Sequence, residues 1–254
     1  MNRIKKIEDI RNKLINNKAS IGSWMQIPNS SVAEIMGYSG YDWVAIDLEH
    51  GAIGVNQLPD IFRALELGNT LPIVRLTEGT PRDCKMALDA GAGGVIIPMV
   101  ESAKNLKELI DSCKWPPEGS RGIGFSRANL FGKFFESYAL EAQNPFIVAM
   151  IENIKAVKNL EAILNVKGID AIFIGPYDLS SSLGITGQFN HPDYIKTIQN
   201  ITEQAKQFSI PVGIHVVEPS ITDLNLKIKE NFQFIAFSID SVFLIDSSKN
   251  PLSE

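Results

Sequence analysis

Two acidic residues in the second half of the chain are separated by 26 positions, and each follows a short apolar run. Glu152 comes after residues 146–151, and Asp178 comes after residues 171–177. A strand, a helix and the next parallel strand need roughly that many residues, so both carboxylates would emerge at the same edge of a parallel sheet. Two oxygen ligands at one edge suit a hard divalent cation such as Mg²⁺ or Mn²⁺, which leaves positions open for a chelating substrate. A pair of solvated acids at loop starts is the plainer alternative.

Further polar side chains stand at the ends of two earlier apolar runs. Asp47 and His50 are three residues apart, so they could form a carboxylate–imidazole dyad in which the acid fixes the ring tautomer. Arg75 places a positive charge at the end of an apolar segment, where it could bind a carboxylate or stabilise a developing enolate oxygen. A structural ion pair of this arginine with Glu49 or Asp89 is the alternative.

A sharp turn and two further histidines complete the set of candidates. Gly175, Pro176 and Tyr177 precede Asp178 at the start of a helix, so backbone N–H groups there could hold a substrate carboxylate. His215, near the end of another apolar run, is a possible supporting residue, as are Glu49, Asp89 and Met150. His191 fits a loop or a helix start better than a site.

These residues need a scaffold that brings strand ends together, and the hydrophobic pattern predicts one. Eight short, continuous apolar runs suit strands buried on both faces of a parallel sheet, and amphipathic segments of helical length lie between them. Eight such alternations in about 250 residues predict an α/β fold, a (β/α)₈ TIM barrel formed as a single domain over residues 1–254, with an N-terminal helix. The expected strands are 21–26, 43–47, 71–76, 94–98, 146–151, 171–175, 211–216 and 234–239, and the expected helices include 56–67, 80–90, 103–113, 155–165 and 192–208.

The connection 101–144 is too long for this pattern. It must hold a helix and then a second segment, 115–141, which is rich in Gly, Arg, Asn and Phe. Glycines in 119–124 permit tight turns or close approach to a ligand. Long loops inside compact domains usually serve as lids or binding loops, so we expect a functional loop after strand four.

Composition restricts the class of partner and the compartment. A net charge of −5 without a long basic run argues against nucleic acid or an anionic membrane as the main partner. Polar residues interrupt the start of the chain, and no apolar run approaches the ~18 residues of a membrane span, so we expect a cytoplasmic protein. Cys84 and Cys113 lack C-x-x-C spacing and are expected to be packing residues in a reducing compartment.

Several ordered motifs together resemble one family. Asp47-Leu48-Glu49-His50, the segment 72–75, Ile151-Glu152 and the segment 175–179 resemble the HpcH/HpaI family of metal-dependent pyruvate aldolases, whose members include 4-hydroxy-2-oxoheptanedioate aldolase and 2-keto-3-deoxy-glucarate aldolase. The likeness covers roughly residues 21–244 and includes the glycine-rich segment 119–124.

The resemblance implies a class II aldolase that reversibly cleaves a 4-hydroxy-2-oxo acid, such as a 2-keto-3-deoxy sugar acid, to pyruvate and an aldehyde. Glu152 and Asp178 would bind Mg²⁺ or Mn²⁺, or else Co²⁺ or Zn²⁺, and pyruvate would chelate this metal. His50, paired with Asp47, would be the general base, and Arg75 would stabilise the enolate. The family also implies a homo-oligomer, possibly a hexamer, whose arrangement we leave open.

Two positions differ from the usual family pattern and bear on substrate choice. Met150 replaces a glutamine that many members carry two residues before the metal-binding glutamate, and Tyr177 replaces a smaller residue. No lysine stands at the carboxyl end of an expected strand, so a Schiff-base mechanism is disfavoured.

Two other functions remain open. The same metal-dependent enolate chemistry could serve an enzyme like the citrate lyase β-subunit or malyl-CoA lyase, or a decarboxylating relative, although no clear basic cluster meets the phosphates of a CoA ester. The alternative of another class is a barrel that binds a 2-oxo acid or a protein partner without turnover. The combination of a base, an arginine and two metal ligands argues against it.

Overall fold

Eight parallel strands close into a barrel in chain order in the computed structural model, which describes residues 1–250 and 252. Every strand predicted from the sequence is present, with bounds that differ from the expected range by at most one residue, so the (β/α)₈ prediction is confirmed. The strands are β1 Ser20–Met25, β2 Trp43–Asp47, β3 Leu71–Arg75, β4 Gly94–Ile97, β5 Phe146–Ile151, β6 Ala171–Ile174, β7 Val212–Val216 and β8 Phe234–Ile239.

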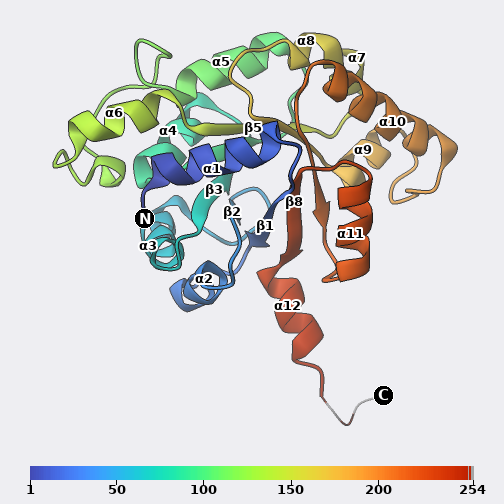
Figure 1. Cartoon of the computed structure of the whole chain (residues 1–254), viewed down its shortest axis with the longest axis horizontal. Helices are drawn as coiled ribbons and strands as arrows, with labels where there is room; N and C mark the ends of the chain where they lie inside the picture. Colours follow the sequence, from blue (N-terminus) through green and yellow to red (C-terminus); the bar gives the residue numbers. More distant parts are fainter. Residues whose placement is uncertain (251, 253–254) are drawn as a thin grey trace.

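Helices surround this barrel (Figure 1), and they agree with the expected helical segments except at two places. The range 56–67 begins with a 3₁₀ turn, and the range 155–165 is divided at Asn159, which ends one helix and whose side-chain amide donates to the carbonyl of Glu101 at 2.9 Å. The helical elements are α1 Arg3–Ile15, α2 Ser30–Gly37, η1 Val55–Gln57, α3 Leu58–Leu67, α4 Pro81–Ala90, α5 Ala103–Cys113, η2 Arg127–Asn129, α6 Phe135–Gln143, α7 Ile154–Lys158, α8 Leu160–Leu164, α9 Pro176–Ser182, α10 Pro192–Gln207, α11 Ile221–Lys229 and α12 Asp240–Ser247.

The first helix closes one end of the barrel. Ile7, Ile10 and Leu14 are buried on α1 and belong to the same apolar cluster as the barrel interior, where Trp43 stacks on Phe234 with ring centroids 4.0 Å apart. The strands begin at this end of the barrel, so α1 covers their amino ends. The carboxyl ends are left open for a site, as is usual in such barrels.

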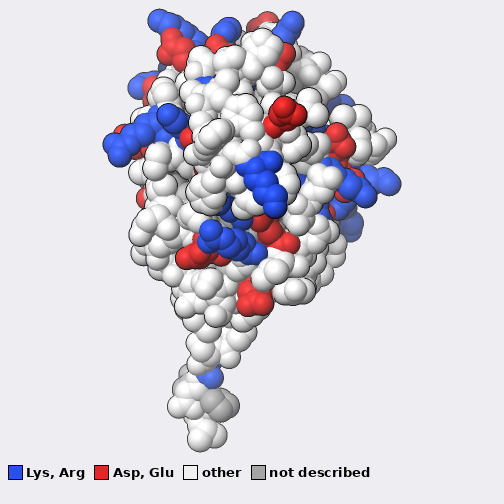
Figure 2. All heavy atoms as spheres, turned by 90° about the vertical axis from the view of Figure 1, so that its left-hand side faces the viewer, with Lys and Arg blue, Asp and Glu red and all other residues white. Residues whose placement is uncertain are grey.

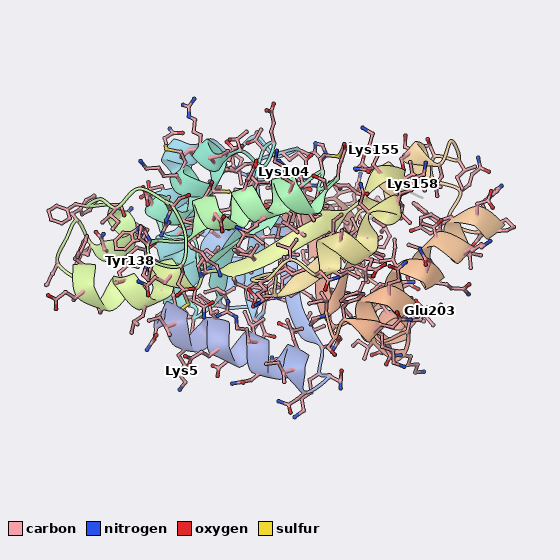
Figure 3. The ribbon with its side chains drawn as sticks, turned by 90° about the horizontal axis from the view of Figure 1, so that it is seen from above. Lys5, Lys104, Tyr138, Lys155, Lys158 and Glu203 are labelled. Atoms are coloured by element: carbon pink, nitrogen blue, oxygen red, sulfur yellow. The ribbon has the colours of Figure 1, made fainter. Side chains whose placement is uncertain are left out.

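The long connection between α5 and β5 lies at the closed end. Arg127 binds Glu66 of α3 at 2.6 Å, and Arg3 of α1 donates to the carbonyl of Ala128 at 2.7 Å. Figure 3 shows Tyr138 on α6 beside this loop. The long loop expected after strand four is thus present, but this lid or binding loop does not cover the site of its own chain. The physical reason is that a segment that follows a barrel helix starts at the amino ends of the strands, because the helices run antiparallel to them.

Other expectations concern the surface and the cysteines. In the described part of the chain, no helix is long and apolar enough to span a membrane. On the face drawn in Figure 2, Lys and Arg side chains are interspersed with Asp and Glu side chains, without a field of one sign. Cys84 and Cys113 are free and buried, which confirms them as packing residues.

Candidate active site

Asp47 and Arg75 form the centre of the site at the carboxyl ends of β2 and β3. The two residues are partners in the register of these strands. Nε of Arg75 donates to Oδ1 of Asp47 at 2.9 Å, and Nη2 donates to Oδ2 at 2.6 Å. This bidentate geometry fixes the plane of the guanidinium, and Arg75 as a whole is only 9% exposed.

The electrostatics of the pair favour the charged forms. Burial alone would raise the pKa of Asp47, but the hydrogen bonds and charge of Arg75 outweigh it and lower the pKa to about 2. Glu49 Oε2 lies 3.0 Å from Nη1 of Arg75 as an ion pair without hydrogen-bond geometry, and this buried oxygen has no hydrogen-bond partner among the described residues. Burial raises the pKa of Glu49 in spite of the arginine.

The structure changes the expected partner of Asp47. Its Oδ1 accepts the backbone N–H of His50 at 3.2 Å and that of Glu49 at 3.1 Å, so the carboxylate holds the backbone of this loop and not the imidazole. The side chain of His50 is exposed at the rim. The dyad suggested by the sequence is therefore corrected to a pair of Asp47 with Arg75, with His50 beside it.

Glu152 stands at the end of β5 in a tight setting. Its side chain is only 2% exposed, and Oε1 accepts the backbone N–H of Met99 at 2.6 Å. Met99 has φ +50°, a left-handed conformation that costs energy in a residue with a side chain and that often occurs at functional sites. On the other side, a Cβ added at Gly175 would lie 2.6 Å from Oε2 of Glu152, so only glycine fits there.

The charge around Glu152 suits a cation. Burial, followed by the charges of Glu49 and Asp178, raises the pKa of Glu152 to about 7 against the lowering effect of the Met99 hydrogen bond. Asp178 is exposed on α9, in the turn that packs on Glu152. In the described residues, no cluster of three His, Cys, Asp or Glu could hold a metal. The two carboxylates of Glu152 and Asp178 nevertheless suit a hard divalent ion whose other ligands are water and substrate.

The turn at residues 175–177 behaves as expected for a helix start. Pro176 is the first residue of α9, so the N–H groups of Tyr177 and Asp178 have no partner within the helix. The ring of Tyr177 is 62% exposed and meets Phe189 edge to face, with centroids 5.1 Å apart. Tyr177 therefore stands at the rim, supported by a second aromatic ring.

His215 and Trp24 lie beneath Arg75. The guanidinium carbon of Arg75 is 5.1 Å from the centre of the Trp24 ring, and the imidazole of His215 is also 5.1 Å from it. Nε2 of His215 is 3.0 Å from the carbonyl oxygen of Ser238. Burial lowers the pKa of this histidine to about 4, helped by the charge of Arg75. A neutral imidazole thus supports the indole that packs against Arg75.

Two further candidates lie elsewhere. Met150 is buried in the barrel interior on β5, two residues before Glu152, which follows the end of this strand. Asp89 lies near the end of α4, 3.6 Å from the buried Arg121 of the long loop, at the closed end of the barrel. Its expected support of the site is therefore wrong for its own chain.

Three site residues were missed from the sequence. Trp24 and Met99 were hidden among apolar residues, where their ring and backbone contacts leave no pattern. Gln26 directly follows β1 and donates its side-chain amide to Oδ2 of Asp47 at 2.9 Å. A polar residue at the carboxyl end of the first strand is a signal that could have identified it.

Known proteins are similar to this chain in sequence and in fold. The model of the family described as HpcH/HpaI aldolase/citrate lyase matches residues 20–247. A hydroxypyruvate/pyruvate aldolase of Roseobacter denitrificans is 36% identical over 96% of this chain and 95% of its own length. A 2-keto-3-deoxy-L-rhamnonate aldolase of Klebsiella pneumoniae is 34% identical over 90% of this chain and 86% of its own length.

A solved structure agrees with these relatives. The crystal structure of an HpcH/HpaI aldolase/citrate lyase family protein from Burkholderia cenocepacia superimposes with a TM-score of 0.87 at 28% identity. The match covers 94% of this chain and 96% of that one. The similarity therefore extends over the whole barrel.

Proposed function

The chain belongs to the HpcH/HpaI aldolase/citrate lyase family and is an aldolase-type lyase, and from this premise we propose that it cleaves a 4-hydroxy-2-oxo acid to pyruvate and an aldehyde with a divalent cation. One observation carries the proposal. Arg75, held in plane by Asp47, stands at the same barrel end as Glu152, whose pKa is raised to about 7 by burial and then by the neighbouring acids. An enolate needs positive charge on its oxygen, and this end offers a guanidinium beside a place for a cation.

Each group at the site has a separate role in the proposed reaction. When bound by Glu152 and Asp178, Mg²⁺ or Mn²⁺ would supply Lewis-acid stabilisation of the 2-oxo group. Arg75 would stabilise the negative charge that develops on the enolate oxygen, and the N–H groups of Tyr177 and Asp178, which have no partner within the helix, would hold the substrate carboxylate.

His50 is the proposed general base. It removes the proton of the C4 hydroxyl, the C3–C4 bond breaks, and the electron pair passes to the pyruvate enolate while the aldehyde leaves. The protonated imidazole then returns the proton to C3 of the enolate, which gives pyruvate and restores the neutral base. The ring is exposed at the rim, where it can reach a bound substrate.

The relatives support the proposed substrate class. The protein from Roseobacter denitrificans is named for pyruvate and that from Klebsiella pneumoniae for a 2-keto-3-deoxy acid. We propose a 2-keto-3-deoxy sugar acid or a similar compound, with Tyr177 and Phe189 next to the aldehyde portion.

A homo-oligomer is part of the proposal. Figure 1 shows α12 projecting away from the barrel beyond the end of β8. Leu244 and Ile245 on this helix are 59% and 67% exposed. A second copy of the chain would remove these apolar side chains from water.

The exchange of pyruvate methyl protons with D₂O, followed by NMR, tests the proposal. Protein stripped with EDTA should exchange slowly, and added Mg²⁺ or Mn²⁺ should restore the reaction. Glu152→Gln should lose both Mn²⁺ binding and exchange. His50→Ala should retain the metal and lose about 10²-fold or more in exchange rate, as expected for a general base.

The matched control is Glu161→Gln, which neutralises an exposed glutamate on α8 and should behave as the wild type. Absence of exchange with every divalent metal tested would refute the proposed enolate chemistry. A fully active His50→Ala variant would refute the role of His50 alone.

A further inference from the structure

We propose that Gln26 is a positioning residue of this site, which holds Asp47 so that Asp47 can orient Arg75; the proposal rests on the function proposed above. Gln26 directly follows β1, at the same barrel end as the other site residues. It is half-buried, and its amide group points to the carboxylate of Asp47.

The two oxygens of Asp47 are held differently. Oδ1 accepts from Nε of Arg75 and from two backbone N–H groups of its own loop. Oδ2 accepts from Nη2 of Arg75 at 2.6 Å and from Nε2 of Gln26 at 2.9 Å. Among the described residues, Gln26 is thus the only side chain besides Arg75 that donates a hydrogen bond to Asp47. Without Gln26, the only donor to Oδ2 would be Arg75, which is the group that Asp47 has to orient.

The backbone of Gln26 is itself fixed by a buried carboxylate. Asp240 is 5% exposed and accepts the N–H groups of Gln26 at 3.0 Å, Ile27 at 2.9 Å and Ser241 at 2.7 Å. It is the first residue of α12, directly after β8, so the end of β8 holds the end of β1. These two strands have an irregular register between Gly22 and Trp24, and the Asp240 contacts restore a defined geometry just beyond that point.

An amide is well suited to this task. It donates a hydrogen bond without adding charge, so it holds the anion of Asp47 and does not compete with Arg75 as a lysine would. The two hydrogen bonds between Asp47 and Arg75 hold the plane of the carboxylate to the plane of the guanidinium. A rotation of the carboxylate therefore tilts the guanidinium. Small tilts of a group that stabilises a transition state reduce the rate strongly, because orientation is part of the stabilisation.

The test compares Gln26→Leu and Gln26→Glu in the metal-dependent exchange of pyruvate methyl protons. Gln26→Leu removes the donor and should lower kcat for exchange about tenfold at every pH between about 5 and 8, with a smaller change in KM and unchanged Mn²⁺ binding. Gln26→Glu replaces the donor by an anion at pH 8, which repels Asp47, and should be slower than Gln26→Leu there.

Lowering the pH should rescue only Gln26→Glu. The introduced carboxyl faces the anions Asp47 of β2 and Asp240 of α12 and the cation Arg75 of β3, with the imidazole of His215 behind Trp24. The two anions favour its protonated form, which donates to Asp47 as the amide does. The ratio of its rate to the wild-type rate should therefore rise severalfold from pH 8 to pH 5, a change that a purely structural defect would not produce.

Gln143→Leu is the matched control. Gln143 is also half-buried and donates its amide to the carbonyl of Pro116 at 3.0 Å, but at the closed end of the barrel, and its loss should leave exchange unchanged. If wild type exchanges and Gln26→Leu remains within twofold of it, the positioning role is refuted. A ratio of the Gln26→Glu rate to the wild-type rate that stays constant from pH 8 to pH 5 would refute the donor role, and this comparison remains decisive if Gln26→Leu does not fold. If the wild type itself fails to exchange, the proposed function is wrong and this inference falls with it.

Discussion

At the scale of single residues, the contact between Gly175 and Glu152 sets how the buried carboxylate is presented. A methyl group at position 175 would lie 2.6 Å from Oε2 and 2.7 Å from Cβ of Glu152, so one of the two residues would have to shift. Gly175→Ala should therefore displace the carboxylate and lower Mn²⁺ affinity about 10- to 100-fold, the range typical of disturbed metal sites. Titration of the variant with Mn²⁺, followed by electron paramagnetic resonance, measures the loss.

Gly124→Ala provides the control at the same scale. A Cβ added at Gly124 meets no atom within 4 Å, so this variant should bind Mn²⁺ as the wild type does. A folded Gly175→Ala variant with unchanged Mn²⁺ affinity would show that Glu152 does not need its present position to bind the metal.

At the scale of elements, α1 acts as a plug for the amino end of the barrel. Ile10 is 1% exposed against the barrel interior, whereas Ile15 on the same helix is 77% exposed. Ile10→Ala should reduce the free energy of unfolding by about 3 kcal/mol, since a buried side chain is lost and a cavity remains. Ile15→Ala should change it by less than about 0.5 kcal/mol. Chemical denaturation of both variants distinguishes a plug from a helix that merely lies on the surface, for which the two losses would be similar.

The elements also explain how far the sequence could predict the molecule. Strands were predictable because buried parallel strands are continuous apolar runs, and their order placed Arg75, Glu152 and Asp178 at one end. The partner of Asp47 was not predictable from spacing. His50 is nearer in sequence, but the register of β2 and β3 sets Asp47 beside Arg75. The long loop was predictable in its place along the chain, but its composition, which resembles that of a binding loop, did not show that its position after α5 puts it at the closed end.

At the scale of the whole molecule, the two ends of the barrel have different tasks. The closed end is held by α1, the long loop and ion pairs such as that of Arg127 with Glu66 at 2.6 Å. The open end concentrates buried charge, which is costly unless it is paired or serves a function. The contacts of α1 and the long loop thus lie away from the site, where groups such as Glu152 are kept in settings that favour chemistry.

The pH dependence of global stability should show the contribution of His215 to this open end. Its pKa is lowered to about 4 in the folded protein, first by burial, against 6.5 for an ordinary histidine. Between these two pH values the unfolded chain binds the proton more readily than the folded protein does. This histidine therefore lowers the free energy of unfolding as the pH falls from 6.5 to 4, and it has no such effect above pH 6.5.

The variant His215→Gln tests this prediction, because glutamine keeps a donor for the carbonyl of Ser238 but does not titrate. Denaturation of both proteins at several pH values should therefore show the wild type losing up to about 2–3 kcal/mol relative to the variant on acidification, at about 1.4 kcal/mol per pH unit. Glu152 and Asp47 titrate in both proteins and largely cancel in this difference. A difference that stays constant from pH 7.5 to pH 4 would mean that the imidazole can be protonated in place, and that the packing of Trp24 beneath Arg75 tolerates a second positive charge.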